Sequence, residues 1–296
     1  MTDLKTIYSE VYKGEEYLYS ELFMEPDTDE SIEDHSDIET DQNMDFTEND
    51  VIPPQVLIPN PINSPFIDAI SPSTMVFLAT LKANNHKSFT RLYQSKRKAA
   101  KWDFKSFVGI LGQELHHDID DTLPLKYIRK AIQPDHSKYH ASRNIVMYPT
   151  SLKARFGRVL VRNGSQPSYK ITITPGNETK VSVGVSYIVP DKMQELQPAI
   201  IMQGHRLREL LSTECVRQIF GEDKTWVDLL DKSSKVTVPN SIPRDVPNYE
   251  LLSFNRLLVT KKFDDIEVVS PGFLDKVLDV FCALAPFHGL LCDWLD

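Results

Sequence analysis

The spacing of apolar residues along the chain predicts helices at both ends of a folded region and strands between them. Apolar positions at helical spacing predict helices over 71–84, 86–100, 103–117 and 191–211, and a final helix that Ser270-Pro271 opens. Shorter runs typical of strands cover 158–162, 169–174, 180–189 and 256–262. Ser71 is expected to cap the first helix, because serine accepts hydrogen bonds from free amides at a helix start.

The order of these elements indicates the fold class. Pro175-Gly176-Asn177 separates two strand-like runs and is a turn signal, so we expect a hairpin there. Helix 191–211 contains Gly204, where an interruption is expected to be easiest. Helices, then strands, then helices, one strand and a last helix are typical of an α+β domain with a mainly antiparallel central sheet flanked by helices.

Charge divides the chain into two unlike parts. Residues 1–50 carry two basic and seventeen acidic side chains, a net charge of −15, so the other 246 residues carry +6 of the formal total of −9. From Glu25 onward this head is rich in Asp, Glu, Ser and Thr, and it is too polar to offset the entropy of ordering. We therefore predict a disordered acidic arm at 1–50, a proline-rich linker at 51–70 and the α+β domain at 71–296.

The first part of the arm differs from the rest because it carries large apolar side chains. Residues of this kind recur at roughly helical spacing within 1–24, and the principal ones are Tyr8, Tyr12, Tyr19, Leu22 and Phe23. Such a segment can fold into the groove of a protein partner. The alternative is a tail that only solubilises the protein, but such a tail has no need of these tyrosines.

Cysteine usage and hydropathy favour an intracellular protein, in the cytoplasm or the nucleus. The three cysteines, Cys215, Cys282 and Cys292, stand in apolar stretches without a CxxC pair, so we predict buried thiols in a reducing compartment. No run of 18 consecutive apolar residues is present, so no transmembrane helix is expected.

Three blocks of sequence carry a family resemblance. They run from Phe77 to Lys87 with Phe89 and Tyr93 beyond, from Tyr169 to Asn177 into Val183-Gly184-Val185, and from Leu251 through Ser270-Pro271-Gly272-Phe273 to Phe287. In this order and spacing they resemble the domain-of-unknown-function 2461 family of bacteria and fungi, over about residues 72–295. The resemblance implies a shared fold, and it implies no reaction, because the biochemical function of that family is not established.

The chain departs from this family in the family's arginine-rich segment, which corresponds to residues 125–139. Apolar Leu125, Ile128 and Ala131 stand where the family has arginines, and Asp135 and Tyr139 are the identities that remain. Leucine, isoleucine and alanine cannot replace the charged fork of arginine. If the protein is an enzyme, the weak catalytic candidates are Asp135, His136 and Tyr139, in a remodelled family site.

No motif indicates a metal or a cofactor. His116 and His117 are adjacent, and adjacent side chains on a helix point about 100° apart, so they are not expected to chelate one ion. His136 and His140 have the spacing of a helical pair but follow Pro134 and lack a third ligand nearby. We therefore predict neither a metal nor a cofactor.

Basic residues form two groups that could contact the phosphates of RNA or DNA. The first group is Arg91, Lys96, Arg97, Lys98 and Lys101, with Trp102 and Phe104 beside it, and it could also serve as a nuclear import signal. The second is Lys153, Arg155, Arg158 and Arg162, in which Arg158 and Arg162 would share one face of a strand. The alternative is that both groups are ordinary solvated surface.

Three hypotheses of function follow. The first is a non-catalytic adaptor whose acidic arm docks a protein partner, within a nucleic-acid-processing assembly. The second is an accessory protein that binds RNA or DNA through the basic groups of its domain. The third is an enzyme of unknown reaction that uses the remodelled family site.

Overall fold

The structure of the protein is a computed structural model that describes residues 46–133, 138–140, 145–158, 166–232, 235–238 and 242–295. The chain divides into Met1–Asp45 and a compact unit, Phe46–Asp296. All described residues belong to the second unit. The predicted docking residues Tyr8, Tyr12, Tyr19, Leu22 and Phe23 lie outside the described residues.

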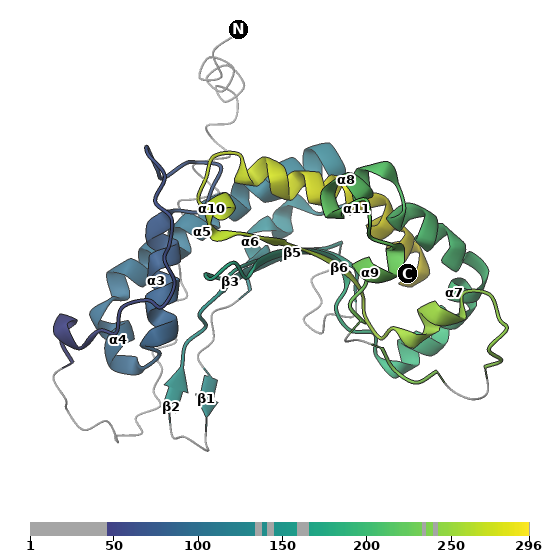
Figure 1. The fold of residues 1–296 in the computed structure, drawn as a ribbon, viewed down its shortest axis with the longest axis horizontal. Helices are drawn as coiled ribbons and strands as arrows, with labels where there is room; N and C mark the ends of the chain where they lie inside the picture. Colours follow the sequence, from purple (N-terminus) through teal and green to yellow (C-terminus); the bar gives the residue numbers. More distant parts are fainter. Residues whose placement is uncertain are drawn as a thin grey trace, which may run out of the picture. The chain divides into compact units, whose positions relative to one another are not determined.

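The second unit is an α+β domain (Figure 1). Its helices are η3 Glu48–Asp50, α3 Pro72–Ala83, α4 Lys87–Leu92, α5 Gln94–Glu114, the π-helix η4 Leu115–Ile119, η5 Leu125–Tyr127, α6 Ile128–Ala131, α7 Pro190–Leu211, α8 Glu214–Phe220, α9 Trp226–Leu229, η7 Tyr249–Ser253, α10 Asp265–Val268 and α11 Phe273–Leu295. Its strands are β1 Lys138–His140, β2 Ile145–Met147, β3 Leu152–Phe156, β4 Ser168–Ile173, β5 Thr179–Val185 and β6 Leu257–Phe263.

Strands β3 to β6 form one antiparallel sheet in the order β3-β4-β5-β6, and β1 pairs with β2 separately. The predicted hairpin is confirmed, since β4 and β5 pair across a turn at Gly176 and Asn177, both of which have positive φ. Asp265 of α10 holds this turn, because its carboxylate accepts hydrogen bonds from the amides of Gly176 (2.8 Å) and Asn177 (3.0 Å). The predicted fold class and antiparallel sheet are therefore confirmed.

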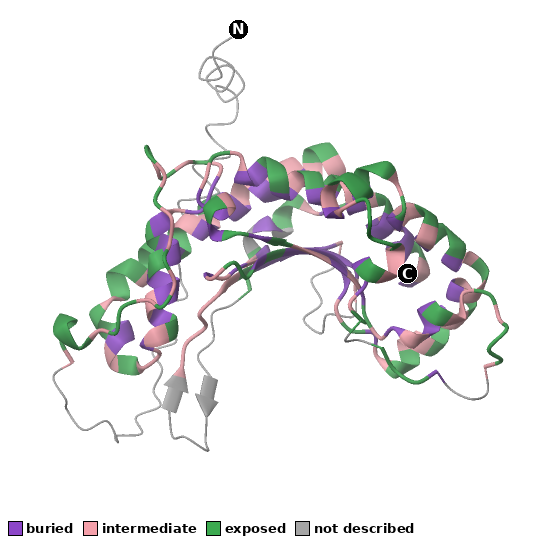
Figure 2. Ribbon diagram, in the orientation of Figure 1, coloured by how far each residue is buried: buried purple, intermediate pink, exposed green. Residues whose placement is uncertain are grey.

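One side of this sheet forms the core of the domain. Helices α5, α10 and α11 lie on the same side of the sheet in Figure 1, and α11 contacts β5. Figure 2 shows buried residues along the strands and on the sides of the helices that pack against them. Tyr169 of β4 packs edge-on against Phe281 of α11, with 5.0 Å between the ring centroids.

Helix α11 is long and apolar enough to span a membrane by length and composition, which the sequence had not led us to expect. In the structure, 56% of its most apolar window is buried inside the domain. Residues Phe273, Val277, Phe281 and Leu284 repeat every three to four positions and are fully buried. Packing against the sheet thus accounts for the apolar character of this helix.

The predicted boundary between the second and third helices is wrong. The break lies at Tyr93, and α5 then continues without interruption to Glu114. Neither glycine nor proline occurs between Lys101 and Asp103, and Ala100 and Phe104 lie on one buried face, so nothing in the sequence or the packing ends a helix there. Gly204, likewise, lies inside an uninterrupted α7.

The strand predicted at 158–162 falls mostly outside the described residues, and its first residue, Arg158, lies in a bend. The strand β3, Leu152–Phe156, was not predicted. Residues 159–162 lie outside the described residues. Lys153 and Arg155 are two residues apart in β3, so their side chains lie on the same face of this strand.

The prediction of three buried thiols holds for Cys292 and is wrong for Cys215 and Cys282, which are exposed. Cys282 directly follows the buried Phe281, but a step of one residue turns a helix by about 100° and carries its side chain to the outer face. An apolar run on an amphipathic helix therefore does not guarantee burial of each of its members.

The proline-rich segment is fixed to the domain at both ends. Near its start, the backbone of Ile52 exchanges two hydrogen bonds with the side chain of Asn84, of 2.8 and 2.7 Å. Near its end, the Ile70 amide donates to the Val268 carbonyl (3.0 Å), and Ala69 and Ile70 are buried. Ser71 then caps α3, as predicted, by accepting a hydrogen bond from the Ser73 amide.

Candidate anion-binding face of the sheet

The two faces of the β3–β6 sheet have opposite chemistry. Apolar residues such as Ile171, Val181 and Val259 point to the core and are fully buried. Side chains alternate along a strand, so the intervening residues point to the other face. We call this second side the open face. Its polar residues are Lys153, Arg155, Ser168, Lys170, Thr172, Lys180, Ser182, Thr260 and Lys262.

The charged residues that the four strands place on the open face are all positive. The four strands contain six lysines and arginines and no aspartate or glutamate. Five of these cations lie on the open face, whereas Lys261 points to the other side, where its ammonium group donates to the Ile219 carbonyl (2.8 Å).

Strand register places like charges directly opposite each other on this face. Arg155 is paired with Lys170 across β3 and β4, and Lys180 is paired with Lys262 across β5 and β6. Like charges directly opposite in an antiparallel pair destabilise a sheet. Among the described residues, no carboxylate forms an ion pair with Lys170, Lys180 or Lys262. These two pairs of like charges therefore lower the stability of the sheet.

The first pair is shielded from water and the second is exposed. Arg155 is only 9% exposed to solvent, whereas Lys180 and Lys262 are exposed. Burial, and then the charge of Arg155, lowers the pKa of Lys170 from 10.5 to about 8. Burial also lowers the pKa of Arg155. Register and burial thus place two cations together where charge is poorly solvated.

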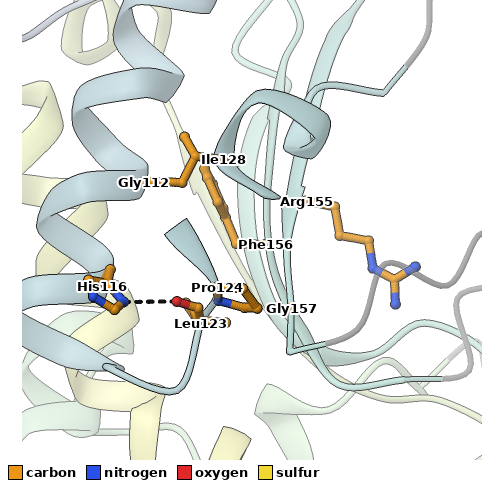
Figure 3. A pocket seen from close by; sticks show the side chains of 8 residues that line it. All are labelled: Gly112, His116, Leu123, Pro124, Ile128, Arg155, Phe156 and Gly157. Atoms are coloured by element: carbon orange, nitrogen blue, oxygen red, sulfur yellow. Dashed lines mark hydrogen bonds between the residues drawn. The ribbon is translucent and has the colours of Figure 1, made fainter. Parts of the chain in front are cut away.

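Both shielded cations are held by hydrogen bonds at the same end of the sheet. Arg155 donates to the carbonyl of Gln166 (3.0 Å), just before β4, and Lys170 donates to the hydroxyl of Ser186, just after β5. Figure 3 shows the Arg155 side chain directed away from the neighbouring Phe156 and from the cavity that both residues line. The two cationic groups therefore extend toward Ser168, which opens β4.

Ser168 has an unusual environment, since it is fully buried and its hydroxyl has no hydrogen-bond partner. Buried polar groups are nearly always paired, so an unpaired hydroxyl requires an explanation. Its cross-strand neighbour is Gly184, which contributes no side chain. Gly184 has φ of 122°, and a Cβ there would lie 2.1 Å from the Leu257 carbonyl oxygen, so only glycine fits.

The first predicted basic group lies elsewhere, on α4 and α5. Arg91 belongs to α4, and Lys96, Arg97, Lys98 and Lys101 belong to the first two turns of α5. Two of them contact aromatic rings: Lys96 lies over Tyr93 (4.5 Å to the centroid) and Arg97 over Tyr148 (5.3 Å). Trp102 beside them is 51% exposed.

The second predicted basic group is divided by the structure. Lys153 and Arg155 lie on the open face, whereas Arg158 donates from Nε to the hydroxyl of Thr122 (2.8 Å). Arg162 lies outside the described residues. Sequence reasoning missed Lys170, Lys180 and Lys262, although each lies in a predicted strand.

The predicted catalytic candidates lie largely outside what the structure describes. Asp135 and His136 lie outside the described residues, and Tyr139 is placed in β1 without its side chain being described. Within the same segment, Ile128 and Ala131 are buried, and α6 contacts α5 and β3. Two of the apolar replacements in the arginine-rich segment thus serve as packing residues.

A second group of polar residues lies in the core and was not predicted. Asp120 accepts hydrogen bonds from Tyr169 (3.2 Å), from the Thr122 amide and hydroxyl, and lies 3.3 Å from Nδ1 of His288. Burial alone would raise the pKa of Asp120, but His288 and Thr122 lower it to about 2. Burial, with the nearby Asp120, raises the pKa of Tyr169.

This core group ties the loop after η4 to α11 and has no room for a substrate. His288 is 0% exposed and Tyr169 is 0% exposed. The cavity beside this loop has a volume of about 10 Å³, at the lower limit for one water molecule. His116 lines this cavity and its Nδ1 donates to the Leu123 carbonyl (2.8 Å) (Figure 3). We therefore interpret Asp120, His288 and Tyr169 as structural.

Among the described residues, no group of three or more His, Cys, Asp or Glu side chains could hold a metal ion. The most prominent feature of this part of the chain is thus a basic, hydroxyl-rich sheet face.

Comparison with known proteins agrees with this fold. The fold is that of a single α+β domain, in which helices cover one side of an antiparallel sheet. Residues 73–289 match the family described as conserved hypothetical protein (DUF2461), and the chain belongs to that family. No curated protein and no solved structure matches the chain.

Proposed function

We propose that the domain binds nucleic acid by holding its phosphate backbone on the open face of the sheet. The observation that carries this proposal is the pairing of Arg155 with Lys170 and of Lys180 with Lys262 on a face whose strands contain no acidic residue. Two like-charged pairs in register cost stability, and a polyanion that lies across them would offset that cost.

The spacing of the cations supports a repeating ligand. Lys153, Lys180 and Lys262 belong to one row across the sheet, and Arg155 and Lys170 belong to the next row. Neighbouring rows on one face are roughly 6.6 Å apart, and neighbouring strands are roughly 4.8 Å apart. The cations are thus distributed over an area that one small anion would not cover.

Hydroxyl groups lie between the cations and suit the same ligand. Thr172 separates Lys153 from Lys180 within the outer row, and Ser182 and Thr260 continue the inner row, 2.9 Å apart. Serine and threonine hydroxyls, with lysine and arginine, are the usual partners of backbone phosphates. Phosphate contacts position a nucleic-acid strand but do not read its bases, so we expect the domain to have little preference for a particular base sequence.

The test is the salt dependence of binding to a single-stranded RNA and a single-stranded DNA of mixed sequence, measured by fluorescence anisotropy. Each lost phosphate contact should reduce the slope of log affinity against log salt by about 0.7 for a single strand. Lys180→Ala/Lys262→Ala should therefore lower the slope by about 1.4. A double variant of two lysines outside the sheet, Lys192→Ala/Lys224→Ala, should leave it unchanged.

The same experiment distinguishes the open face from the helical basic group. Replacing Lys96, Arg97 and Lys98 by alanine should weaken binding only if α5 also contacts the strand. No binding to either nucleic acid at 50 mM salt would overturn the proposal, as would a slope that responds only to the α5 variant.

A second candidate function, binding of a protein partner, is favoured by the proline-rich segment. Leu57, Ile62 and Ile67 are 93%, 88% and 85% exposed, which is unusual for large apolar side chains in one short segment. Leu57 also lines an open groove of about 440 Å³ together with Ile266. This surface and the predicted docking residues of 1–24 would serve the same adaptor role.

Immunopurification with mass spectrometry tests this second function. Full-length protein should be compared with a protein lacking residues 1–50 and with Leu57→Ser/Ile62→Ser. Partners lost from the truncated protein alone would assign docking to the arm. Partners lost from the double variant alone would assign docking to the proline-rich segment. Identical partner sets for all three proteins would contradict an adaptor role.

A further inference from the structure

The exposed cations of the open face stand in a single row across the sheet. Lys153 of β3, Lys180 of β5 and Lys262 of β6 share the register row of Thr172. All three lysines are exposed, and none of them forms an ion pair with another described residue. Three strand spacings separate the ends of this row, roughly 14 Å. A ligand can therefore reach these ammonium groups from solvent without entering the core.

The open face is the concave side of the sheet. In Figure 1 the sheet is bowed, and α5, α10 and α11 lie on its convex side. A concave surface follows the outline of a rounded ligand and can contact it at several points at once. A nucleic-acid duplex has such an outline, and proteins that bind duplexes through the backbone recognise them largely by shape.

The aromatic rings of the four strands point away from the open face. They belong to Phe156, Tyr169 and Phe263, and all three residues are buried in the core. Proteins that bind single strands stack the bases on exposed aromatic rings, and this stacking supplies much of their affinity. A single strand on the open face would leave its bases without such a platform. A duplex needs none, because its bases already stack on one another and only its backbone faces the protein.

Charge density favours the same form of nucleic acid. A duplex carries one negative charge per roughly 1.7 Å of its axis, and a single strand carries one per roughly 3.4 Å. Along the row of lysines, a duplex therefore presents about twice as many phosphates as a single strand. Contacts between cations and phosphates release counterions, so the denser backbone should bind more tightly.

We propose that the open face binds the backbone of a nucleic-acid duplex in preference to a single strand, through the row of Lys153, Lys180 and Lys262. This inference rests on the proposed function and names the form of nucleic acid that the domain recognises. RNA and DNA duplexes share the phosphate chemistry that the row contacts, so the experiment includes both.

The experiment measures the binding of one labelled strand to the full-length protein twice, alone and after annealing to its complement. Strands of about 15 nucleotides give roughly one and a half turns of duplex. We expect annealing to tighten binding by about tenfold or more at about 50 mM salt, with RNA, with DNA or with both. On the duplex, Lys180→Ala/Lys262→Ala should lower the salt slope by about 1.8, since each lost contact removes about 0.9. Lys192→Ala/Lys224→Ala should leave that slope unchanged.

An aromatic ring placed on the open face should reduce or reverse the preference. Thr172→Tyr adds a ring between Lys153 and Lys180, and tyrosine is well suited to a strand. Stacking of one base on this ring should raise the affinity for the single strand about 5- to 150-fold and should not raise the affinity for the duplex. Thr172→Val, which has the branched shape of threonine and no ring, is the matched control and should show no such rise.

The outcomes separate this inference from the function on which it rests. Equal or weaker binding after annealing, with both RNA and DNA, would overturn the inference and leave the proposed function intact. A tighter duplex whose slope ignores Lys180→Ala/Lys262→Ala would overturn it as well, because the row would not be the contact. The annealing comparison needs no variant, so it decides the question even if Thr172→Tyr folds poorly. Absence of binding by any strand or duplex would instead overturn the proposed function, and this inference with it.

Discussion

Adjacent residues of β4 lie in two different environments, which makes the two faces of the sheet directly comparable. Ile171 is fully buried among the apolar side chains of the core, whereas Lys170 and Thr172 point to the open face. On the core face every contact adds to stability by removing apolar surface from water. On the open face, like charges oppose each other and one hydroxyl is left without a partner.

This difference teaches where to look for function in a protein whose family has no assigned reaction. The core face is explained by folding alone. The open face is not, since lysines opposite each other and a buried unpaired hydroxyl both reduce stability. Features that folding does not require, and that lie together, are better candidates for binding than the buried Asp120 and His288, which are satisfied by each other.

The sharpest comparison is between Ile171→Ala and Thr172→Ala. Ile171 is 0% exposed, so its truncation leaves a cavity and should lower the free energy of unfolding by about 2–5 kcal/mol. Thr172 lies on the open face and should change it by no more than about 0.5 kcal/mol. Urea denaturation of both variants measures the contrast. Equal losses would show that the open face is part of a second core.

The attachment of the hairpin tests whether the sheet itself depends on α10. Asp265 is 4% exposed and accepts hydrogen bonds from two amides of the β4–β5 turn. Asp265→Ala leaves these amides unpaired and should cost about 2–3 kcal/mol of unfolding free energy. Asp245→Ala, at an exposed position, is the matched control. A loss similar to that of the control would contradict the anchoring role.

The sequence predicts the hairpin but not the partner that anchors it. Pro175-Gly176-Asn177 is a local signal, because glycine and asparagine tolerate the positive φ that the turn requires. Asp265 lies far along the chain, and no local pattern connects it to this turn. The break at Tyr93, which has φ of −106° and ψ of 29°, was likewise missed, because neither glycine nor proline marks it.

The candidate site was predictable only in part for the same reason. Lys153 and Arg155 stand out as a local basic group. Lys170, Lys180 and Lys262 are single lysines in three strands, and only the strand register brings them to one face. Lys170 lies between two apolar residues of β4, which gives its face, but the adjacent Lys261 and Lys262 of β6 leave the face open, and the pairing of β5 with β6 depends on contacts between distant segments. Local patterns cannot supply such register.

Lys170 allows the cost of the open face to be measured. Its side chain is charged at pH 7 although burial and Arg155 disfavour the charge. Lys170→Met keeps the length of the side chain and removes the charge, so it should raise the free energy of unfolding at pH 7, on the order of 2 kcal/mol. The matched control Lys224→Met, in an exposed position, should have little effect.

The pH dependence gives this prediction its sign. The folded protein loses the Lys170 proton near pH 8, whereas the unfolded chain keeps it up to the ordinary pKa of 10.5. Between these two pKa values the unfolded state binds more protons than the folded state. The free energy of unfolding of the wild-type protein should therefore rise with pH in this range. Lys170→Met should lose that rise. A variant that is less stable than the wild type at pH 7 would show that Lys170 supports the fold and does not burden it.

The smallest expected effect separates stability from binding most directly. Lys180→Glu places opposite charges across from each other at the pair with Lys262, so it should stabilise the domain by about 0.2–1 kcal/mol. Lys262→Glu should do the same, and the double variant should restore like-charge repulsion and lose the gain. Thermal unfolding at low salt measures the cycle, and because both positions are exposed, high salt should screen the gain.

Each single variant should meanwhile weaken nucleic-acid binding, since it replaces a phosphate contact with a repulsive carboxylate. Single variants that gain stability and keep full affinity would show that the Lys180–Lys262 pair burdens the sheet without serving this ligand.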